Sequence, residues 1–300
     1  MKIAVTGAFS YSGKYITKKL LDRGEEVITL TNHPNRPDPF NGKVKAFPLN
    51  FSNEEELINY LRGVDVLVNT YWIRFDKGSN TQPKAVENTG VLIKAAAKAG
   101  VKRIVHISIT NPSADSHLPY FWGKAANEKF VMESGASYAI LRPTVLFGKE
   151  DILINNIAWL LRTFPVFGLP GDGSYKLSPV YVDDLAELAV ESVYKKESYI
   201  WDAVGPDEFT FKEMTELIEK TVEKNRPLLP FPPRLALIAA QCLSIFVKDV
   251  MLTPEEVDGL MANLLISKEQ PRCKTSLRDW LKENKSTVGI NYASELARHF

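Results

Sequence analysis

Short apolar runs alternate with helical stretches through the first half of the chain, and this alternation limits the fold more than any other feature. The runs "KIAVTG", "EVITLT", "VKAFPLN", "VDVLVNT", "VKRIVHIS" and "SYAILRP" are mostly separated by segments of helical periodicity, such as residues 13–24 and 82–100. Apolar strands joined by helices of this length belong to a parallel sheet that is covered on both faces. The sequence therefore predicts an α/β fold, a Rossmann-type doubly wound parallel sheet whose ligands sit beyond the carboxyl ends of the strands.

After Gly148 the alternation ends and most of the remaining chain has helical periodicity interrupted by prolines. Residues 170–179 are typical of a loop, and "SYIWDAVG" is one more expected strand of the sheet. We expect a dinucleotide-binding domain of residues 1–147 and 175–205, with a smaller, mostly helical C-terminal substrate lobe of residues 148–174 and 206–300.

Composition and residue spacing exclude several classes of protein. The formal net charge of +1 provides no basic field for nucleic acid. Only two cysteines occur, Cys242 and Cys273, which argues against a disulfide framework or zinc knuckle and for a reducing compartment. His106 and His117 have no partners at metal-ligand spacing, so we expect no metal. The first strand begins at once and leaves no room for a signal peptide, so we expect a cytoplasmic protein.

The longest apolar run, from Leu235 to Val247, is too short to span a bilayer comfortably. Pro232 and Pro233 precede it and favour a helix start, where a missing N–H costs nothing. We expect a buried helix. The alternative is a helix that faces a membrane or a protein partner.

The stretch "TGAFSYSG" stands between the first strand and the first helix, where such turns cradle a diphosphate on backbone N–H groups. Gly7 permits the tight turn, and Gly13 lets the helix pack closely. Ser10 stands where many such turns carry a middle glycine, and it either blocks a phosphate or donates its hydroxyl to one. The predicted cofactor contacts here are Gly7, Ser10, Tyr11, Ser12 and Gly13. The alternative is a plain strand-to-helix connection.

The end of the second strand commonly selects between the two nicotinamide cofactors, through an acid for NAD or an arginine for NADP. This chain has neither at Thr31 and Asn32, but His33 and Arg36 follow closely. Arg36 either meets a 2′-phosphate or is a solvated loop residue. The cofactor is thus predicted to be NAD(P), with NADP favoured over NAD.

Tyr120 and Lys124 lie four residues apart on a predicted helix and so face the same way. An ammonium beside a phenol favours the phenolate, which can exchange a proton with a carbonyl or alcohol during hydride transfer. Tyr15 and Lys19 have the same spacing in the first helix, so position must separate the two pairs. Tyr120 follows the fifth strand, which ends "HISIT" and offers a hydroxyl at Ser108 or Thr110.

The segments "VTGAFSYSGKYI", "VHISIT", "YFWGK" and "ILRPTVLFG" together resemble the short-chain dehydrogenase/reductase superfamily. Their order is similar to the extended and atypical branches, which include NAD(P)-dependent epimerases and dehydratases and the nucleotide-binding accessory subunit of respiratory complex I. The resemblance covers roughly residues 1 to 215. It implies the following roles: a pyrophosphate turn at Gly7, Ser10 and Gly13; a cofactor-selecting position near Asn32; a catalytic pair in Tyr120 and Lys124, with Lys124 also on the ribose; a catalytic hydroxyl at Ser108 or Thr110; and a nicotinamide contact at Pro143 and Thr144.

Two departures from the family pattern bear on cofactor affinity. Ser10 replaces the usual middle glycine, and Asn50 stands where an adenine-contacting aspartate is common. The leading hypothesis is an NAD(P)-dependent oxidoreductase or epimerase-like enzyme that acts on a small carbonyl or alcohol substrate. The alternative is a non-enzymatic NAD(P)H-binding sensor, scaffold or assembly factor. A homodimer is the commonest state for a soluble protein that associates.

Overall fold

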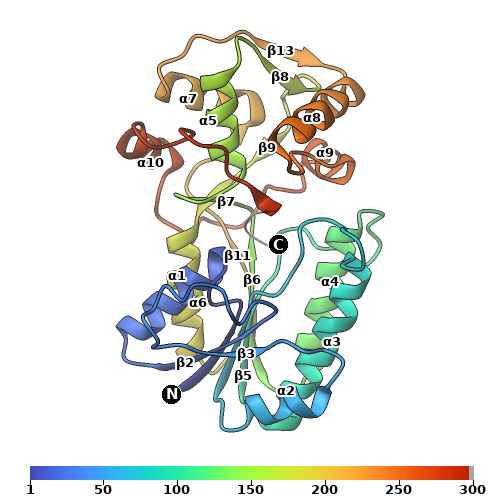
Figure 1. The fold of residues 1–300 in the computed structure, drawn as a ribbon, viewed down its shortest axis with the longest axis vertical. Helices are drawn as coiled ribbons and strands as arrows, with labels where there is room; N and C mark the ends of the chain where they lie inside the picture. Colours follow the sequence, from blue (N-terminus) through green and yellow to red (C-terminus); the bar gives the residue numbers. More distant parts are fainter. Residues whose placement is uncertain (297–300) are drawn as a thin grey trace. The chain divides into compact units, whose positions relative to one another are not determined.

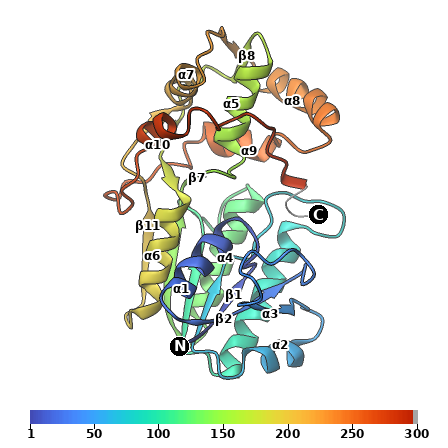
Figure 2. The same cartoon turned by 60° about the vertical axis from the view of Figure 1, so that its left-hand side comes forward.

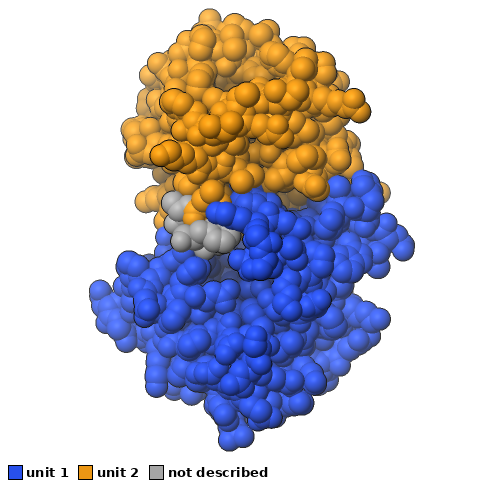
Figure 3. Space-filling view, turned by 45° about the vertical axis from the view of Figure 1, so that its right-hand side comes forward, with its two compact units in different colours: residues 1–143, 183–203 blue, residues 144–182, 204–300 orange. Residues whose placement is uncertain are grey.

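The computed structural model describes residues 1–296, and the chain divides into two compact units. Residues 1–143 and 183–203 form unit 1, and residues 144–182 and 204–300 form unit 2 (Figure 3). The chain therefore leaves unit 1 at the end of its sixth strand, returns for one helix and one strand, and leaves again.

Unit 1 is built on one seven-stranded sheet in which every strand pair is parallel. The strand order is β11-β6-β5-β4-β1-β2-β3, so the direction of winding reverses between β1 and β4, as in a doubly wound fold. The predicted fold class is confirmed. The strands are β1 (Lys2–Thr6), β2 (Glu26–Thr31), β3 (Lys45–Pro48), β4 (Val66–Asn69), β5 (Arg103–Ile107), β6 (Ser137–Pro143) and β11 (Tyr199–Ala203).

Helices cover both faces of this sheet (Figures 1 and 2). On one face lie α1 (Tyr11–Asp22) and α6 (Val182–Tyr194); on the other lie α2 (Glu54–Leu61), α3 (Gln82–Ala99) and α4 (Pro119–Met132). Under the second group, fully buried Ala4, Leu67, Ile104 and Ile140 form one apolar cluster with helix residues such as Leu92. Side chains alternate between the two faces along a strand, so His106, two residues after Ile104 in β5, also faces α2, α3 and α4.

Unit 2 packs five helices and six short strands, as far as the structure describes it, around Phe147, Phe209, Met214 and Trp280. The expectation of a loop at residues 170–179 was wrong in part. The strand β9 (Lys176–Leu177) lies there, and β10 (Pro179–Tyr181) begins at its last residue. Their backbones pair with β12 (Phe209–Thr210) and β7 (Val145–Phe147), which lie elsewhere in the chain. The elements are β7 (Val145–Phe147), α5 (Leu153–Thr163), β8 (Phe167–Pro170), β9 (Lys176–Leu177), β10 (Pro179–Tyr181), β12 (Phe209–Thr210), α7 (Phe211–Thr221), β13 (Leu228–Phe231), α8 (Pro233–Val247), α9 (Pro254–Met261) and α10 (Leu277–Asn284).

The apolar run at residues 235–247 forms α8, but the expectation of a buried helix was wrong. No residue of α8 is buried, and Ile245 and Phe246 are 80% and 77% exposed. Most side chains of α8 are apolar, and the helix contacts chiefly β8, so much of its apolar surface stays exposed. Within residues 1–296 no helix combines the length and apolarity needed to cross a membrane.

Candidate functional site

The turn between β1 and α1 is closed by its own backbone and by Ser10. Gly7 has a φ of +65°, and the Ser10 N–H donates to the Gly7 carbonyl at 2.8 Å. The Ser10 hydroxyl donates to the same carbonyl at 2.6 Å. The hydroxyl proton is therefore used inside the turn, and backbone N–H groups are what the turn presents to a ligand.

Gly13, in the first turn of α1, lies against that same carbonyl. A Cβ built on Gly13 would lie 2.2 Å from the Gly7 oxygen, so only glycine fits here. Tyr11 and Ser12 begin the helix. The side chain of its N-cap, Ser10, accepts no hydrogen bond from the helix N–H groups, and the first turn of the helix holds no acidic residue. The positive end of α1 is thus left unneutralised by its own side chains, as an anion site requires.

The predicted adenosine contacts follow β2 and β3, which lie beside β1 at the same edge of the sheet. Asn32 is exposed and Arg36 is half-buried, in a turn where the Arg36 N–H donates to the His33 carbonyl at 3.1 Å. Asn50 is exposed, and its amide already donates to Glu56 at 3.2 Å. The structure therefore brings these three residues to the edge of the sheet that carries the turn between β1 and α1, and the Asn50 amide is already bonded to Glu56 of α2.

The loop that follows β4 is fixed by buried polar side chains. Thr6 Oγ1 accepts hydrogen bonds from the N–H groups of Thr70 (2.7 Å) and Tyr71 (3.1 Å) and donates to Asn69 Oδ1 (3.0 Å). Thr70 Oγ1 donates back to the Thr6 carbonyl at 2.6 Å. These bonds tie the end of β1, directly before Gly7, to the loop that carries Trp72.

Tyr120 and Lys124 lie on α4 and both contact the Trp72 ring. The Tyr120 and Trp72 rings are perpendicular with centroids 5.6 Å apart, and Lys124 Nζ lies 5.0 Å from the Trp72 centroid. Lys124 is 3% exposed, and its Nζ donates to the Ile107 carbonyl at 2.9 Å. Burial lowers the pKa of Lys124 to about 7, although the nearby Glu128 carboxylate opposes the shift.

Tyr15 and Lys19, the pair with the same spacing in α1, have a different environment. Lys19 forms ion pairs with Asp183 (2.9 Å) and Glu187 (3.2 Å) of α6, so its charge holds two helices together. Tyr15 contacts the ring of Tyr11 edge-on at 6.0 Å. Position does separate the two pairs, because only Lys124 is buried at the carboxyl edge of the sheet.

Both candidate hydroxyls donate to carboxylates. Ser108 Oγ donates to Glu128 Oε1 at 2.6 Å, and Thr110 Oγ1 donates to Asp202 Oδ2 at 3.1 Å. The choice between them stays open. Glu128 also accepts two hydrogen bonds from Arg142, at 2.8 and 2.6 Å, in a bidentate ion pair. Sequence reasoning missed Glu128, although it lies four residues after Lys124 and so on the same helix face.

His106 lies in β5 and is fully buried near Lys124. Asn69 uses its oxygen to accept from Thr6 and Tyr71, so its amide donates to His106 Nδ1 at 3.1 Å and the proton lies on Nε2. Burial, with a smaller effect from the Lys124 charge, lowers the pKa of His106 to about 3. His106 is therefore a neutral core residue, and residues 1–296 contain no group of three His, Cys, Asp or Glu side chains that could hold a metal.

The predicted nicotinamide segment lies where the chain passes from unit 1 to unit 2. Pro143 ends β6, and its carbonyl accepts from the Thr110 N–H at 2.9 Å. Thr144 is buried, and its hydroxyl donates to the Ser178 carbonyl. Pro143 is therefore held by the loop after β5 in unit 1, and Thr144 by the residue between β9 and β10 in unit 2.

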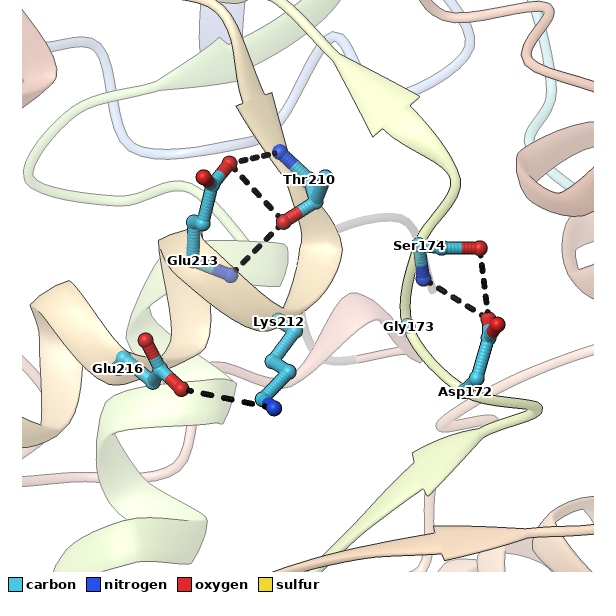
Figure 4. A pocket seen from close by; sticks show the side chains of 7 residues that line it. All are labelled: Asp172, Gly173, Ser174, Thr210, Lys212, Glu213 and Glu216. Atoms are coloured by element: carbon cyan, nitrogen blue, oxygen red, sulfur yellow. Dashed lines mark hydrogen bonds and ion pairs between the residues drawn. The ribbon is translucent and has the colours of Figure 1, made fainter.

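Unit 2 carries a shallow pocket of about 350 Å³ (Figure 4) that contains none of the predicted site residues. Its polar side chains already pair with one another: Asp172 with Ser174, Glu213 with Thr210, and Lys212 with Glu216. The lining residues are Asp172, Gly173, Ser174, Thr210, Lys212, Glu213 and Glu216.

Known proteins similar to this chain share the nucleotide-binding half. The sequence model of the NAD(P)H-binding family matches residues 7–157. The 40 kDa subunit of the mitochondrial NADH-ubiquinone oxidoreductase of Neurospora crassa is 24% identical over 278 residues, which cover 88% of this chain and 72% of that subunit. Several other curated relatives are longer, and the chain spans from 24% to 62% of their length.

Two solved structures share the fold of the chain. An NADPH-dependent quinone oxidoreductase from Escherichia coli, complexed with NADPH, superposes with a TM-score of 0.76 at 19% identity, over 94% of this chain and 99% of that one. A nucleoside-diphosphate-sugar epimerase from Staphylococcus aureus superposes with a TM-score of 0.73 at 18% identity, over 94% and 100%. The architecture is thus one that reductases and epimerases share.

Proposed function

Because the chain belongs to the NAD(P)H-binding family, in an extended short-chain dehydrogenase/reductase-like group, we propose that it is an NAD(P)-dependent oxidoreductase or epimerase-like enzyme. The observation that supports this best is the Tyr120–Lys124 pair. It follows the central strand β5, with the Lys124 ammonium buried against the Ile107 carbonyl. The proposed substrate is a small carbonyl or alcohol compound, and unit 2 is proposed to supply its lobe.

The residues around the first turn fit a dinucleotide. The N–H of Gly7 donates to the Leu30 carbonyl and that of Ser10 to the Gly7 carbonyl, so the pyrophosphate would meet the N–H groups at the start of α1. Gly13 keeps this helix start close to the turn, because a Cβ there would force the turn and α1 apart. The pyrophosphate would be held by Gly7, Ser10, Tyr11, Ser12 and Gly13. Asn32 and Arg36 would hold the adenosine ribose, Asn50 the adenine, Lys124 the second ribose, and Pro143 and Thr144 the nicotinamide.

NADP is the proposed cofactor. No acidic residue follows β2 in the place where a carboxylate would bond a ribose 2′-hydroxyl, and Arg36 is half-buried in that loop. Asp38, the nearest acid, accepts hydrogen bonds from the backbone of Phe40 (2.7 Å) and Gly42 (2.6 Å), so its carboxylate serves the loop.

A nicotinamide held by these residues would supply the hydride chemistry of the reaction. Tyr120 would move the proton at its phenolic oxygen, and the positive charge of Lys124 would favour the phenolate. Ser108 or Thr110 would orient the substrate oxygen. Glu128, held by Arg142, keeps a negative charge beside Lys124 and so supports its protonated form.

Titration with NADPH and NADH, followed by reduced-nicotinamide fluorescence, tests the cofactor part of the proposal. We expect tighter binding of NADPH than of NADH. A substrate screen then compares Tyr120→Phe with Tyr15→Phe, the matched tyrosine of α1. Turnover lost only in Tyr120→Phe supports an enzyme, whereas no binding of either nucleotide refutes the proposal.

A second candidate function is an NAD(P)H-binding sensor, scaffold or assembly factor in the cytoplasm, and the exposure of α8 favours it. Leu235, Ile238, Ile245 and Phe246 are all more than half exposed, which a protein–protein or membrane contact would relieve. Ile245→Asp should then abolish association with a partner or with vesicles and leave NADPH affinity unchanged. Light scattering of the purified chain tests for a homodimer in the same series.

A further inference from the structure

Trp72 is built into the space between the two members of the proposed catalytic pair. Its ring is perpendicular to that of Tyr120, at 5.6 Å, and lies 5.0 Å from the Lys124 ammonium. A Cβ at Gly123 would lie 2.5 Å from Cη2 of the indole and 3.2 Å from Cζ2. The indole therefore packs on bare backbone of α4, one residue before Lys124.

The loop that carries Trp72 is held on its N-terminal side by bonds that fix the ring's position. The N–H groups of Thr70 and Tyr71 both donate to Thr6 Oγ1, and the Tyr71 hydroxyl accepts from Asn88 of α3 at 3.0 Å. Two neighbouring elements thus anchor the residues before Trp72. The contact between Trp72 and α4 is therefore held in place within unit 1, because all of these anchoring residues lie in that unit.

The indole has two opposed effects on the Lys124 charge. Its π face attracts the ammonium, which favours the protonated form, and its bulk excludes water, which favours the neutral form. The charged and titratable groups facing Lys124 are His106 of β5, Glu128 and Tyr120 of α4, and Arg142 of β6, whose charge is paired with Glu128. Burial by all its neighbours lowers the pKa of Lys124. A cation–π contact contributes less than full desolvation, which can shift a pKa by about 3–5 units, so we expect water exclusion to be the larger effect of the indole.

We propose that Trp72 is a positioning residue of the site, which shields Lys124 from water and holds the Tyr120 ring, and so sets the pH range in which the pair exchanges protons. This inference rests on the proposed function. It assigns to Trp72 no contact with the reacting atoms. Its consequence is that the loop after β4 tunes the protonation of a lysine on a different element.

The test is the titration of the Lys124 side chain by NMR in protein labelled with ¹⁵N and ¹³C at lysine, with Lys124→Met identifying its signal. In Trp72→Ala we expect the Lys124 midpoint to rise by at least about one pH unit, because water reaches the ammonium. Trp72→Phe keeps an aromatic cover and should shift the midpoint less. Trp122→Phe is the matched control, because Trp122 lies on the same helix and is 36% exposed; it should shift nothing.

An unchanged or lowered Lys124 midpoint in Trp72→Ala overturns the proposal. If that variant does not fold, Trp72→Leu decides, because leucine keeps an apolar side chain against Gly123 but covers less of the ammonium, and an unchanged Lys124 midpoint there has the same meaning. NADPH titration of the wild-type chain distinguishes a failure of this inference from a failure of the proposed function. A protein that binds NADPH while Trp72 leaves Lys124 unmoved refutes only this inference, and a protein that binds no NADPH refutes the proposed function.

Discussion

Substitution of Gly13 by alanine should disable the cofactor site with one methyl group. The added Cβ would lie 2.2 Å from the Gly7 oxygen, whereas ordinary contacts begin near 3.4 Å. The turn and α1 must therefore move about 1.2 Å apart, and overpacking of this kind costs about 1–3 kcal/mol of unfolding free energy. The same movement displaces the N–H groups that face the pyrophosphate. Because a hydrogen bond to a charged group contributes about 1.5–3 kcal/mol, losing one weakens NADPH binding at least about tenfold.

Gly24→Ala is the matched control at the other end of α1. Gly24 has a φ of +79°, and a Cβ there would meet nothing within 4 Å, so the variant has a backbone cost of about 1 kcal/mol without any clash. Nicotinamide fluorescence gives the Kd and thermal unfolding gives Tm for both variants. The reasoning fails if Gly13→Ala binds NADPH with the wild-type Kd and melts at the same temperature as Gly24→Ala.

Three further substitutions test the charges of the site. Lys124→Met should stabilise the protein most at pH 7 and less towards pH 10. Between the folded pKa of Lys124, about 7, and its ordinary value of 10.5, only the unfolded chain holds the proton. The stability of the wild-type protein therefore rises with pH across that range, and the gain from the substitution shrinks. Urea unfolding at several pH values measures this, and a pH-independent difference contradicts it. Arg142→Met leaves the buried Glu128 carboxylate without its arginine partner and should lower the free energy of unfolding in urea by about 3–5 kcal/mol. A loss of free energy below about 1 kcal/mol would show that water replaces the arginine. Arg36→Ala should weaken NADPH binding about tenfold and leave NADH binding unchanged, since only NADPH carries the 2′-phosphate; equal loss for both would assign Arg36 a structural role.

The sheet could be predicted from sequence because its signal is local and repeated. Most apolar runs are followed by a turn and a helix, and the seven expected strands all lie in the parallel sheet. Gly13 was likewise predictable, because its place at the start of the first helix, six residues after Gly7, already implies close packing. By contrast, β9 is two residues long and exists only through its pairing with β12 more than thirty positions away. No periodicity within so short a segment distinguishes it from a loop.

The contacts within the candidate site were harder to predict than the residues themselves. Tyr120, Lys124 and the hydroxyls carry a spacing signal, but Glu128 and Arg142 come from a helix and a strand and meet only in the fold. Trp72 depends on the absence of a side chain at Gly123, which no pattern connects to the loop after β4. The exposure of α8 also lay beyond the sequence, because an apolar helix is equally suited to a core and to an interface.

The burial of Lys124 bears on the choice between an enzyme and a binding protein. A lysine that only holds a ribose works best when it stays charged, which an exposed position ensures. Lys124 is instead 3% exposed and has a pKa of about 7, so near neutral pH it exists in both protonation states. A buried lysine beside a phenol changes the proton affinity of that phenol as its own charge changes, which matters where Tyr120 moves a proton. The burial of Lys124 is therefore expected of an enzyme more than of a protein that only binds a nucleotide.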